Sequence, residues 1–302
     1  MNKKIAKFLR EYERENKIYL DGTISYSKDV INILNSNING SDNTNELDTL
    51  FSDNIKRLFN CNNYILTKGS TLSLIDDKCL VINDNIKTSD GFNYEINDLI
   101  DYEEIRHIIK DNNIRVLFVG SKYYTRFIDY KKLSQIAHDF NCKLVVDISN
   151  NLEFIISKRL VCPYEYSDMI IISRFNHILC MSNKELSISN DYLLKYKLGF
   201  LEYLLELQEL DIDRIVNNVN DLIRSFKDNN IYVCTNGSDN NLVSIKVSNG
   251  DEAKLLLYKN NIVVNNYGNK LIFNLVNNYL DIDYYELGNK VSKIIGKGDV
   301  FD

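Results

Sequence analysis

From residue 78 to residue 173, short apolar runs alternate with amphipathic stretches. The apolar runs are KCLVIND at 78–84, IRVLFVGS at 114–121, CKLVVDIS at 142–149 and SDMIIIS at 167–173. Helical spacing of apolar positions separates them, in DYEEIRHIIKDNN at 101–113 and DYKKLSQIAHDFN at 129–141. Such alternation indicates crossover units, in which parallel strands are buried by helices on both faces. We therefore predict a three-layer α/β/α domain with a mostly parallel sheet.

The flanking regions follow different patterns. Helical spacing recurs at 2–17, 28–36, 46–59 and across 190–228, which includes the leucine-rich LGFLEYLLELQEL. The last part carries the strand-like runs IYVCTNG, NLVSIKV, IVVNN and KLIFNLV, with helices expected at DEAKLLLYKNN and 284–295. We expect four segments: an N-terminal helical segment (1–45), a large α/β domain (46–190), connecting helices (191–230) and a small C-terminal α+β domain (231–302).

Composition narrows the class of protein. The chain has 302 residues, 44% of them hydrophobic and 26% charged, which is typical of a soluble globular protein. It contains no run of about 18 apolar residues, so we expect no membrane span. The first sixteen residues carry charges throughout and predict an amphipathic helix instead of a secretion signal, so we expect a cytoplasmic protein. The net charge of −6 argues against binding to a nucleic-acid backbone.

The six cysteines show no CxxC pair and no histidine at zinc-ligand spacing. Most of them adjoin apolar residues, as in KCLVI and NCKLVV. We interpret them as reduced thiols and expect no metal site.

Candidate chemistry lies at the strand ends, because ligands of open α/β sheets bind beyond the carboxyl ends of the strands. These positions are Gly120 and Ser121, Asp147 to Asn150, and Ser173 to His177. Asp147 ends an apolar strand, where an unpaired carboxylate would be costly to bury. It must meet a cation or strong hydrogen-bond donors, cap a helix, or lie at the exposed lip of the sheet.

The segment GSKYYTRFIDYKKLSQIAHDFNCKLVVDISN at 120–150, followed by SDMIII, resembles the core of serine hydroxymethyltransferase, a fold-type-I pyridoxal-phosphate enzyme. The similarity extends in the same order to LIDYEEI at 99–105, NGSDNNLVSIKV at 236–247 and KNNIVVNN at 259–266. The resemblance implies a fold-type-I transferase architecture and, if any cofactor binds, pyridoxal phosphate.

Some of the family's cofactor positions are compatible with this sequence. The resemblance places Asp147 where the family's aspartate pairs with the pyridine nitrogen of the cofactor. It places Gly69 and Ser70 on the phosphate-binding loop. Asn150 takes the place of a family histidine, and Ser121 follows the neighbouring strand. We regard all five as vestigial cofactor-binding candidates.

The catalytic positions are lost. Asn176 falls on the lysine that forms the Schiff base, Thr23 near the catalytic glutamate, and Ile272 near the arginine that binds the substrate carboxylate. Without the lysine, no internal aldimine can form. The arginine fork has no neutral substitute.

Three functional hypotheses remain open. In the first, the chain is a catalytically inactive relative of serine hydroxymethyltransferase, without a cofactor, that binds another protein or a second copy of itself, as a homodimer. In the second, it is a divergent pyridoxal-phosphate enzyme of glycine and serine one-carbon metabolism with a relocated lysine, Lys122 or Lys184. In the third, it binds a phosphate-containing ligand at Gly69 and Ser70 without turnover.

Overall fold

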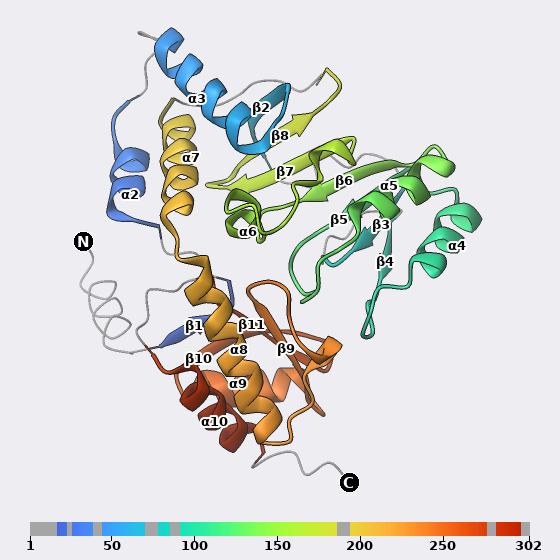
Figure 1. The fold of residues 1–302 in the computed structure, drawn as a ribbon, viewed down its shortest axis with the longest axis vertical. Helices are drawn as coiled ribbons and strands as arrows, with labels where there is room; N and C mark the ends of the chain where they lie inside the picture. The colour runs from blue at the N-terminus through green and yellow to red at the C-terminus, as the bar shows by residue number, and fades with distance from the viewer. Residues whose placement is uncertain are drawn as a thin grey trace, which may run out of the picture. The chain divides into compact units, whose positions relative to one another are not determined.

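A computed structural model describes residues 17–22, 26–38, 44–69, 78–84, 91–185, 194–276 and 282–296. They form two compact units (Figure 1): a larger one from residues 26–212, and a smaller one that joins the described residues before 26 to those from 213 onward. This grouping differs from the four expected segments. The smaller unit includes an N-terminal strand, and the larger one takes in residues on both sides of 46–190. The helix expected at 2–17 lies almost wholly outside the described residues.

The larger unit is built on a seven-stranded sheet of order β2-β8-β7-β6-β5-β3-β4. Within it only β8 runs antiparallel to its neighbours. The strands are β2 (Asn63–Lys68), β3 (Cys79–Ile82), β4 (Phe92–Tyr94), β5 (Val116–Val119), β6 (Lys143–Asp147), β7 (Met169–Arg174) and β8 (His177–Ser182). The predicted α/β architecture with a mostly parallel sheet is confirmed.

The central strands are buried along nearly their whole length, which explains why they are continuous apolar runs in the sequence. Every residue of β3, β5 and β8 is buried. One face of the sheet forms a core cluster that includes Val81, Phe118, Val145, Ile171 and Ile178. This packing fixes the register of the strands and thereby the position of the loops at their carboxyl ends.

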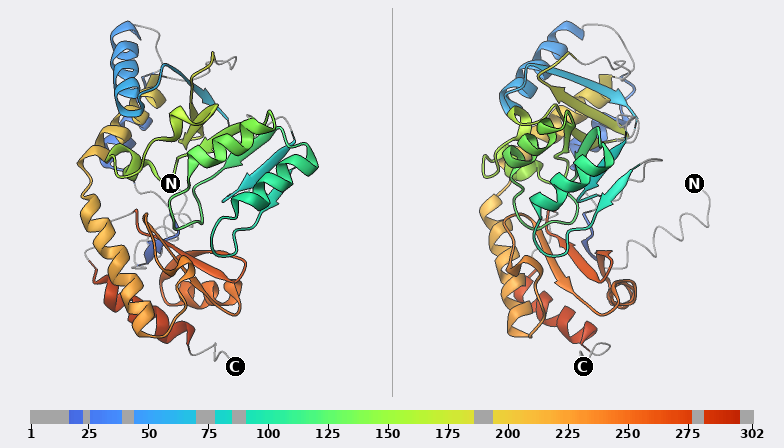
Figure 2. Two further views of the ribbon diagram at one scale, coloured as in Figure 1. Left: turned by 45° about the vertical axis from the view of Figure 1, so that its right-hand side comes forward. Right: turned by 90° about the vertical axis from the view of Figure 1, so that its right-hand side faces the viewer.

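Helices flank this sheet. They are α2 (Lys28–Asn35), α3 (Thr44–Phe59), α4 (Tyr102–Asn112), α5 (Tyr130–Asp139), α6 (Leu152–Ile156) and α7 (Leu194–Glu206). Side-chain caps fix where two of them begin: Asp101 accepts from the amides of Glu103 and Glu104, and Asp129 from that of Lys132. Helices α4 and α5 pack side by side, and α7 packs against α2 and α3 (Figures 1 and 2).

The smaller unit has a four-stranded sheet of order β1-β10-β11-β9. Its strands are β1 (Ile18–Leu20), β9 (Leu242–Lys246), β10 (Ile262–Tyr267) and β11 (Lys270–Asn274), and its helices are α8 (Ile212–Asp228), α9 (Gly250–Lys259) and α10 (Tyr284–Ile295). The helices bury one face of the sheet in an apolar core. The strand expected at 231–237 is reduced to a bridge between Val233 and Ile245, followed by a 3-10 turn at Cys234–Asn236.

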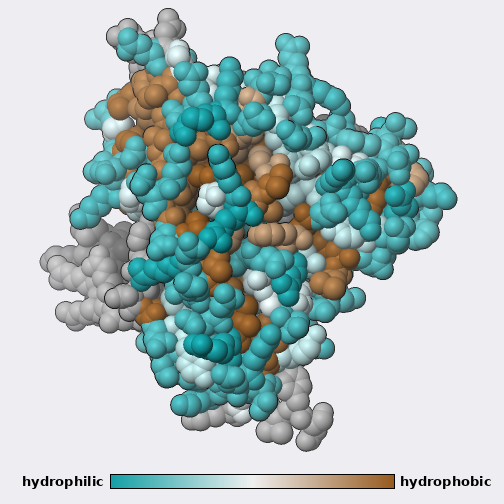
Figure 3. All heavy atoms as spheres, in the orientation of Figure 1, coloured by the Kyte–Doolittle hydropathy of each residue, from teal (hydrophilic) through white to brown (hydrophobic). Residues whose placement is uncertain are grey.

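Apolar side chains also gather on the surface of the larger unit, over α2, α3 and α7 (Figure 3). Ile31 on α2 and Leu50 on α3 are 44% and 49% exposed. Exposed apolar groups that cluster in this way are typical of interaction surfaces. None of the described helices is long and apolar enough to cross a membrane.

Candidate functional site

Asn176, which the resemblance places at the family's lysine position, lies at the tip of a β-hairpin. Strands β7 and β8 are antiparallel, Arg174 pairs with His177, and only Phe175 and Asn176 connect them. Both connecting residues have positive φ angles, 54° and 58°, as a two-residue type I′ turn requires. Asn176 is exposed and offers no amine. A Schiff base therefore cannot form at this position.

Phe175, the first residue of the turn, packs in an aromatic cluster. Its ring centroid lies 4.6 Å from that of Tyr26, 5.4 Å from that of Phe200 and 6.2 Å from that of Tyr203. Aromatic pairs in this range add stability beyond that of simple burial. The cluster anchors the hairpin tip to α7 and compensates for the unusual left-handed conformation of a phenylalanine.

His177, which opens β8, is buried and has structural contacts. Its ring stacks on Tyr196 with centroids 3.9 Å apart, and its Nδ1 lies 2.9 Å from the carbonyl oxygen of Phe175. The histidine is therefore held by the hairpin itself and by α7, as expected of a polar residue that satisfies local backbone groups.

Arg174 is the last residue of β7, and its guanidinium is buried. It donates to the carbonyl oxygens of Ser149 and Ser173, the latter at 2.8 Å, and to the hydroxyl of Tyr203 at 3.3 Å. Only 8% of the residue is exposed. Arg174 thus joins the hairpin to the loop after β6 and to α7. Sequence reasoning assigned this arginine no role.

Glu153 on α6 is a fully buried carboxyl group near that guanidinium. Burial raises the pKa of Glu153, whereas its own backbone amide and Arg174 act to lower it. Neither carboxyl oxygen has a hydrogen-bond partner among the other described residues. Burial therefore favours the protonated carboxyl of Glu153, and the nearby guanidinium of Arg174 offsets this only in part. The signal in the sequence was a lone acid between Leu152 and Phe154.

Asp147 lies at the carboxyl edge of the sheet, as predicted, and is 8% exposed. Its Oδ1 accepts from the amide of Ser149 at 2.8 Å. Burial raises the pKa of Asp147; the Ser149 hydrogen bonds lower it, the nearby Asp84 raises it further, and Arg174 lowers it. The sequence left open whether Asp147 meets a cation, strong donors, a helix end or solvent. The structure shows strong local donors at Ser149, with the guanidinium of Arg174 nearby.

The loops at this edge are joined to one another by hydrogen bonds. Asn83 after β3 donates from its side chain to the carbonyl of Gly120 at 3.0 Å and accepts from the amides of Tyr123 and Tyr124 at 2.7 Å. Gly120 permits this approach, because a Cβ there would lie 2.7 Å from the Asn83 carbonyl oxygen. Asn83 was not singled out from the sequence.

The same pattern continues toward β7. The hydroxyl of Ser121 accepts from the amide of Asn150 at 3.1 Å, and the hydroxyl of Ser149 accepts from the amide of Ser173 at 2.8 Å. Ser121 and Asn150, two of the predicted cofactor-binding residues, are thus brought together. In this structure the backbone amide of Asn150 is hydrogen-bonded to the hydroxyl of Ser121.

Of the remaining predicted site residues, Gly69 lies at the carboxyl edge of the sheet and Ile272 lies in the smaller unit. The amide of Gly69, at the end of β2, donates to the carbonyl of Asn176 at 3.3 Å, so it too lies at this edge. Ile272 lies in β11 of the smaller unit, opposite Ser244, and is 2% exposed. Ser70 and Thr23 lie outside the described residues.

The two candidate lysines lie at opposite ends of the sheet. Lys122 follows β5 at the carboxyl edge, and its amine lies 2.7 Å from Asp84, whose side chain is 2% exposed. Lys184 follows the antiparallel β8, and its amine lies 2.8 Å from Asp168, which precedes β7. Of these two lysines, only Lys122 is at the edge that holds Asp147.

Burial disfavours the thiolate form of five of the six cysteines. All six are free, and burial raises the pKa of Cys61 and Cys162 to about 11 and that of Cys79 and Cys180 to about 12. Within the part of the chain that the structure describes, no three histidine, cysteine or acidic side chains gather as metal ligands.

Comparison with known proteins agrees with this architecture. The family model described as serine hydroxymethyltransferase matches residues 66–179, the segment from β2 into β8 that carries Asp147 and Asn176. A serine hydroxymethyltransferase of Mesoplasma florum is 24% identical over 200 residues, which cover 58% of this chain and 48% of that protein. The matched region thus spans about half the length of this curated relative.

The strand order, with the antiparallel β8 as the second strand of the hairpin, and the matched region together define a fold-type-I pyridoxal-phosphate transferase fold. Within that class, residues 66–179 are similar in sequence to the serine hydroxymethyltransferases.

Proposed function

We propose that the chain is a serine hydroxymethyltransferase-like protein that does not perform the family's reaction and acts by binding another protein or a second copy of itself. The observation that carries this proposal is the β7–β8 turn. The resemblance places Asn176 at the family's lysine position. The turn that holds it is fixed by its backbone conformation and by the aromatic contacts of Phe175.

The hydrogen bonds of the carboxyl edge support the same conclusion. Asn150 and Ser121 bind each other, and Asp147 accepts from Ser149. The apolar surface over α2, α3 and α7 favours a binding role. On this proposal, the protein holds no pyridoxal phosphate, although the family it is related to depends on that cofactor.

A second candidate function is supported by Lys122. Its amine is at the carboxyl edge, beside a buried Asp84 that interacts electrostatically with Asp147. A pyridoxal-phosphate enzyme with a relocated lysine would use this amine. The position of Lys184, paired with Asp168 at the other end of β8, does not favour it.

A thermal melt distinguishes an inactive binding protein from a relocated-lysine enzyme and from a phosphate-binding protein. We expect the melting midpoint to stay the same, within error, when pyridoxal phosphate or inorganic phosphate is added, because a ligand stabilises only a fold that binds it. Lys122→Ala is the matched variant. A rise with pyridoxal phosphate that Lys122→Ala abolishes would establish the relocated-lysine enzyme. An equal rise with both compounds in both proteins would establish a phosphate-ligand site.

A further inference from the structure

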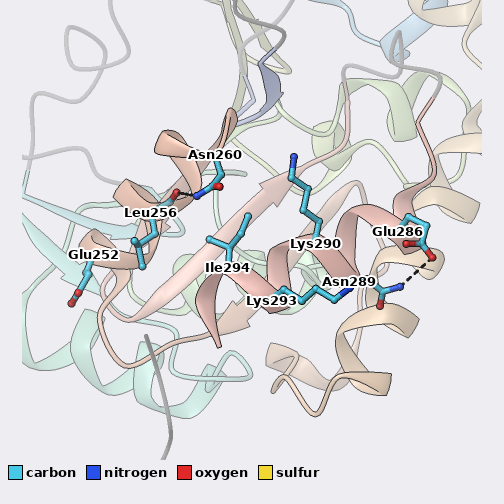
Figure 4. A pocket seen from close by; sticks show the side chains of 8 residues that line it. All are labelled: Glu252, Leu256, Asn260, Glu286, Asn289, Lys290, Lys293 and Ile294. Atoms are coloured by element: carbon cyan, nitrogen blue, oxygen red, sulfur yellow. Dashed lines mark hydrogen bonds between the residues drawn. The ribbon is translucent and has the colours of Figure 1, made fainter. Parts of the chain in front are cut away.

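The smaller unit carries a groove between α9 and α10 (Figure 4), with a volume of about 670 Å³. The residues that line it come from the two helices: Glu252, Leu256, Asn260, Glu286, Asn289, Lys290, Lys293 and Ile294. None of them belongs to the strand ends discussed above. The groove therefore needs an explanation of its own.

Its apolar part is formed by Leu256 and Ile294, both half-buried, and Ile294 rests on the core of the unit. From Glu252 on α9 to Asn260, which follows that helix, the wall spans about two helical turns, about 12 Å at 1.5 Å per residue. A wall of this length matches two turns of a helix that lies in the groove and covers Leu256 and Ile294 with apolar side chains.

The charges around the groove have a definite order. Figure 4 shows Glu252 and Glu286 toward its two ends, with Lys290 and Lys293 between them. Neither lysine forms a salt bridge with another residue that the structure describes. A central positive charge that is not neutralised favours an occupant whose middle turn is acidic.

We propose that this groove binds an amphipathic α-helix of a partner protein, whose apolar stripe covers Leu256 and Ile294 and whose central acidic residues face Lys290 and Lys293. This proposal rests on the proposed binding function and names the kind of partner.

A display library of amphipathic helical peptides, about 16 residues long and varied in the charge beside the apolar stripe, tests the proposal on the full chain. We expect enrichment of peptides with acidic residues in the middle turn. Lys290→Glu combined with Lys293→Glu should weaken them about tenfold and favour basic peptides instead, because like charges then face each other. Lys131→Glu with Lys143→Glu, at exposed positions of the other unit, is the matched control and should leave binding unchanged.

Leu256→Asp should abolish binding, and an unchanged circular dichroism spectrum would show that the variant is folded. No enrichment, or peptides whose binding ignores both the charge reversal and Leu256→Asp, would overturn the proposed groove function. Neither result would bear on the inactive carboxyl edge, which is tested by pyridoxal phosphate. A lysine adduct there would overturn the proposed lack of catalysis and leave the groove result standing.

Discussion

Replacing Arg174 with methionine is expected to lower the free energy of unfolding by about 3–5 kcal/mol. Methionine keeps much of the length of the side chain but removes its hydrogen bonds to Ser149, Ser173 and Tyr203. These three acceptors then lose their donor, and hydrogen bonds to a charged group contribute about 1.5–3 kcal/mol each. Urea unfolding followed by circular dichroism measures the change.

The matched control is Arg106→Met. Arg106 pairs with Asp139 at 2.8 Å on the surface, where both side chains are substantially exposed. Such pairs contribute less than about 1 kcal/mol, so the control should stay close to the native protein. Equal effects of the two substitutions would contradict the role assigned to Arg174.

Glu153→Gln tests the buried carboxyl of Glu153 through the pH dependence of the free energy of unfolding. Because the fold raises the pKa of Glu153, the folded state favours the protonated carboxyl. The stabilisation that comes from the protonated Glu153 is fully present below the pKa of this group in the unfolded chain. It is lost as the pH rises through the higher pKa of the folded state. We therefore expect glutamine to be nearly neutral at acid pH and stabilising, relative to the native protein, at neutral pH. Glu165→Gln, at an exposed position, is the matched control, and an equal pH dependence of the two variants would contradict the role given to burial.

The second large effect is expected for Asn83→Ala, which should destabilise the protein by about 3 kcal/mol. The substitution removes one buried hydrogen bond to Gly120 and two from Tyr123 and Tyr124, and each buried backbone group left unpaired costs about 1–3 kcal/mol. Alanine must also adopt the left-handed conformation that asparagine has here, with φ of 57°.

Asn113→Ala is the control for the cost of placing an alanine in the left-handed conformation. Asn113 ends α4 with φ of 49°, and its side chain is exposed. The two variants share the conformational cost of about 1 kcal/mol but not the lost hydrogen bonds. A similar unfolding midpoint for both would mean that Asn83 does not hold the carboxyl-edge loops together.

Much of the fold could be predicted because its strands are buried on both faces. Strands β3, β5 and β6 lie within the predicted apolar runs, β7 extends one residue beyond its run, and α10 was predicted at its observed bounds. Asp147 was placed correctly at the carboxyl edge by the same pattern. Here local sequence and tertiary environment agree, so periodicity was sufficient.

Strand β8, which follows the turn at Phe175 and Asn176, was not predicted from the sequence. After β7, the chain reads Arg174, Phe175, Asn176 and His177, with no glycine to signal a two-residue turn. The polar residues suggested the end of a strand, whereas they form the corner of a hairpin. The packing of Phe175 on Tyr26 and Phe200, far away in the sequence, stabilises that corner and could not be read locally.

The hydrogen-bonded carboxyl edge was also beyond the sequence. Asn83 and Arg174 acquire their roles only when parallel strands bring their loops together. The sequence did contain two hints, a glutamate within an apolar stretch at 152–156 and an arginine at the end of the run 169–174. A charged residue in such a place needs a partner, and here each partly compensates the other.

We propose that no lysine of this chain forms a specific Schiff base with pyridoxal phosphate. Borohydride reduction of the protein with equimolar pyridoxal phosphate, followed by peptide mapping, tests this proposal. We expect only scattered, substoichiometric labelling of surface lysines, the same in the native protein and in Lys122→Ala. One stoichiometrically modified lysine, at 122 or elsewhere, with an aldimine absorption band that reduction removes, would contradict it.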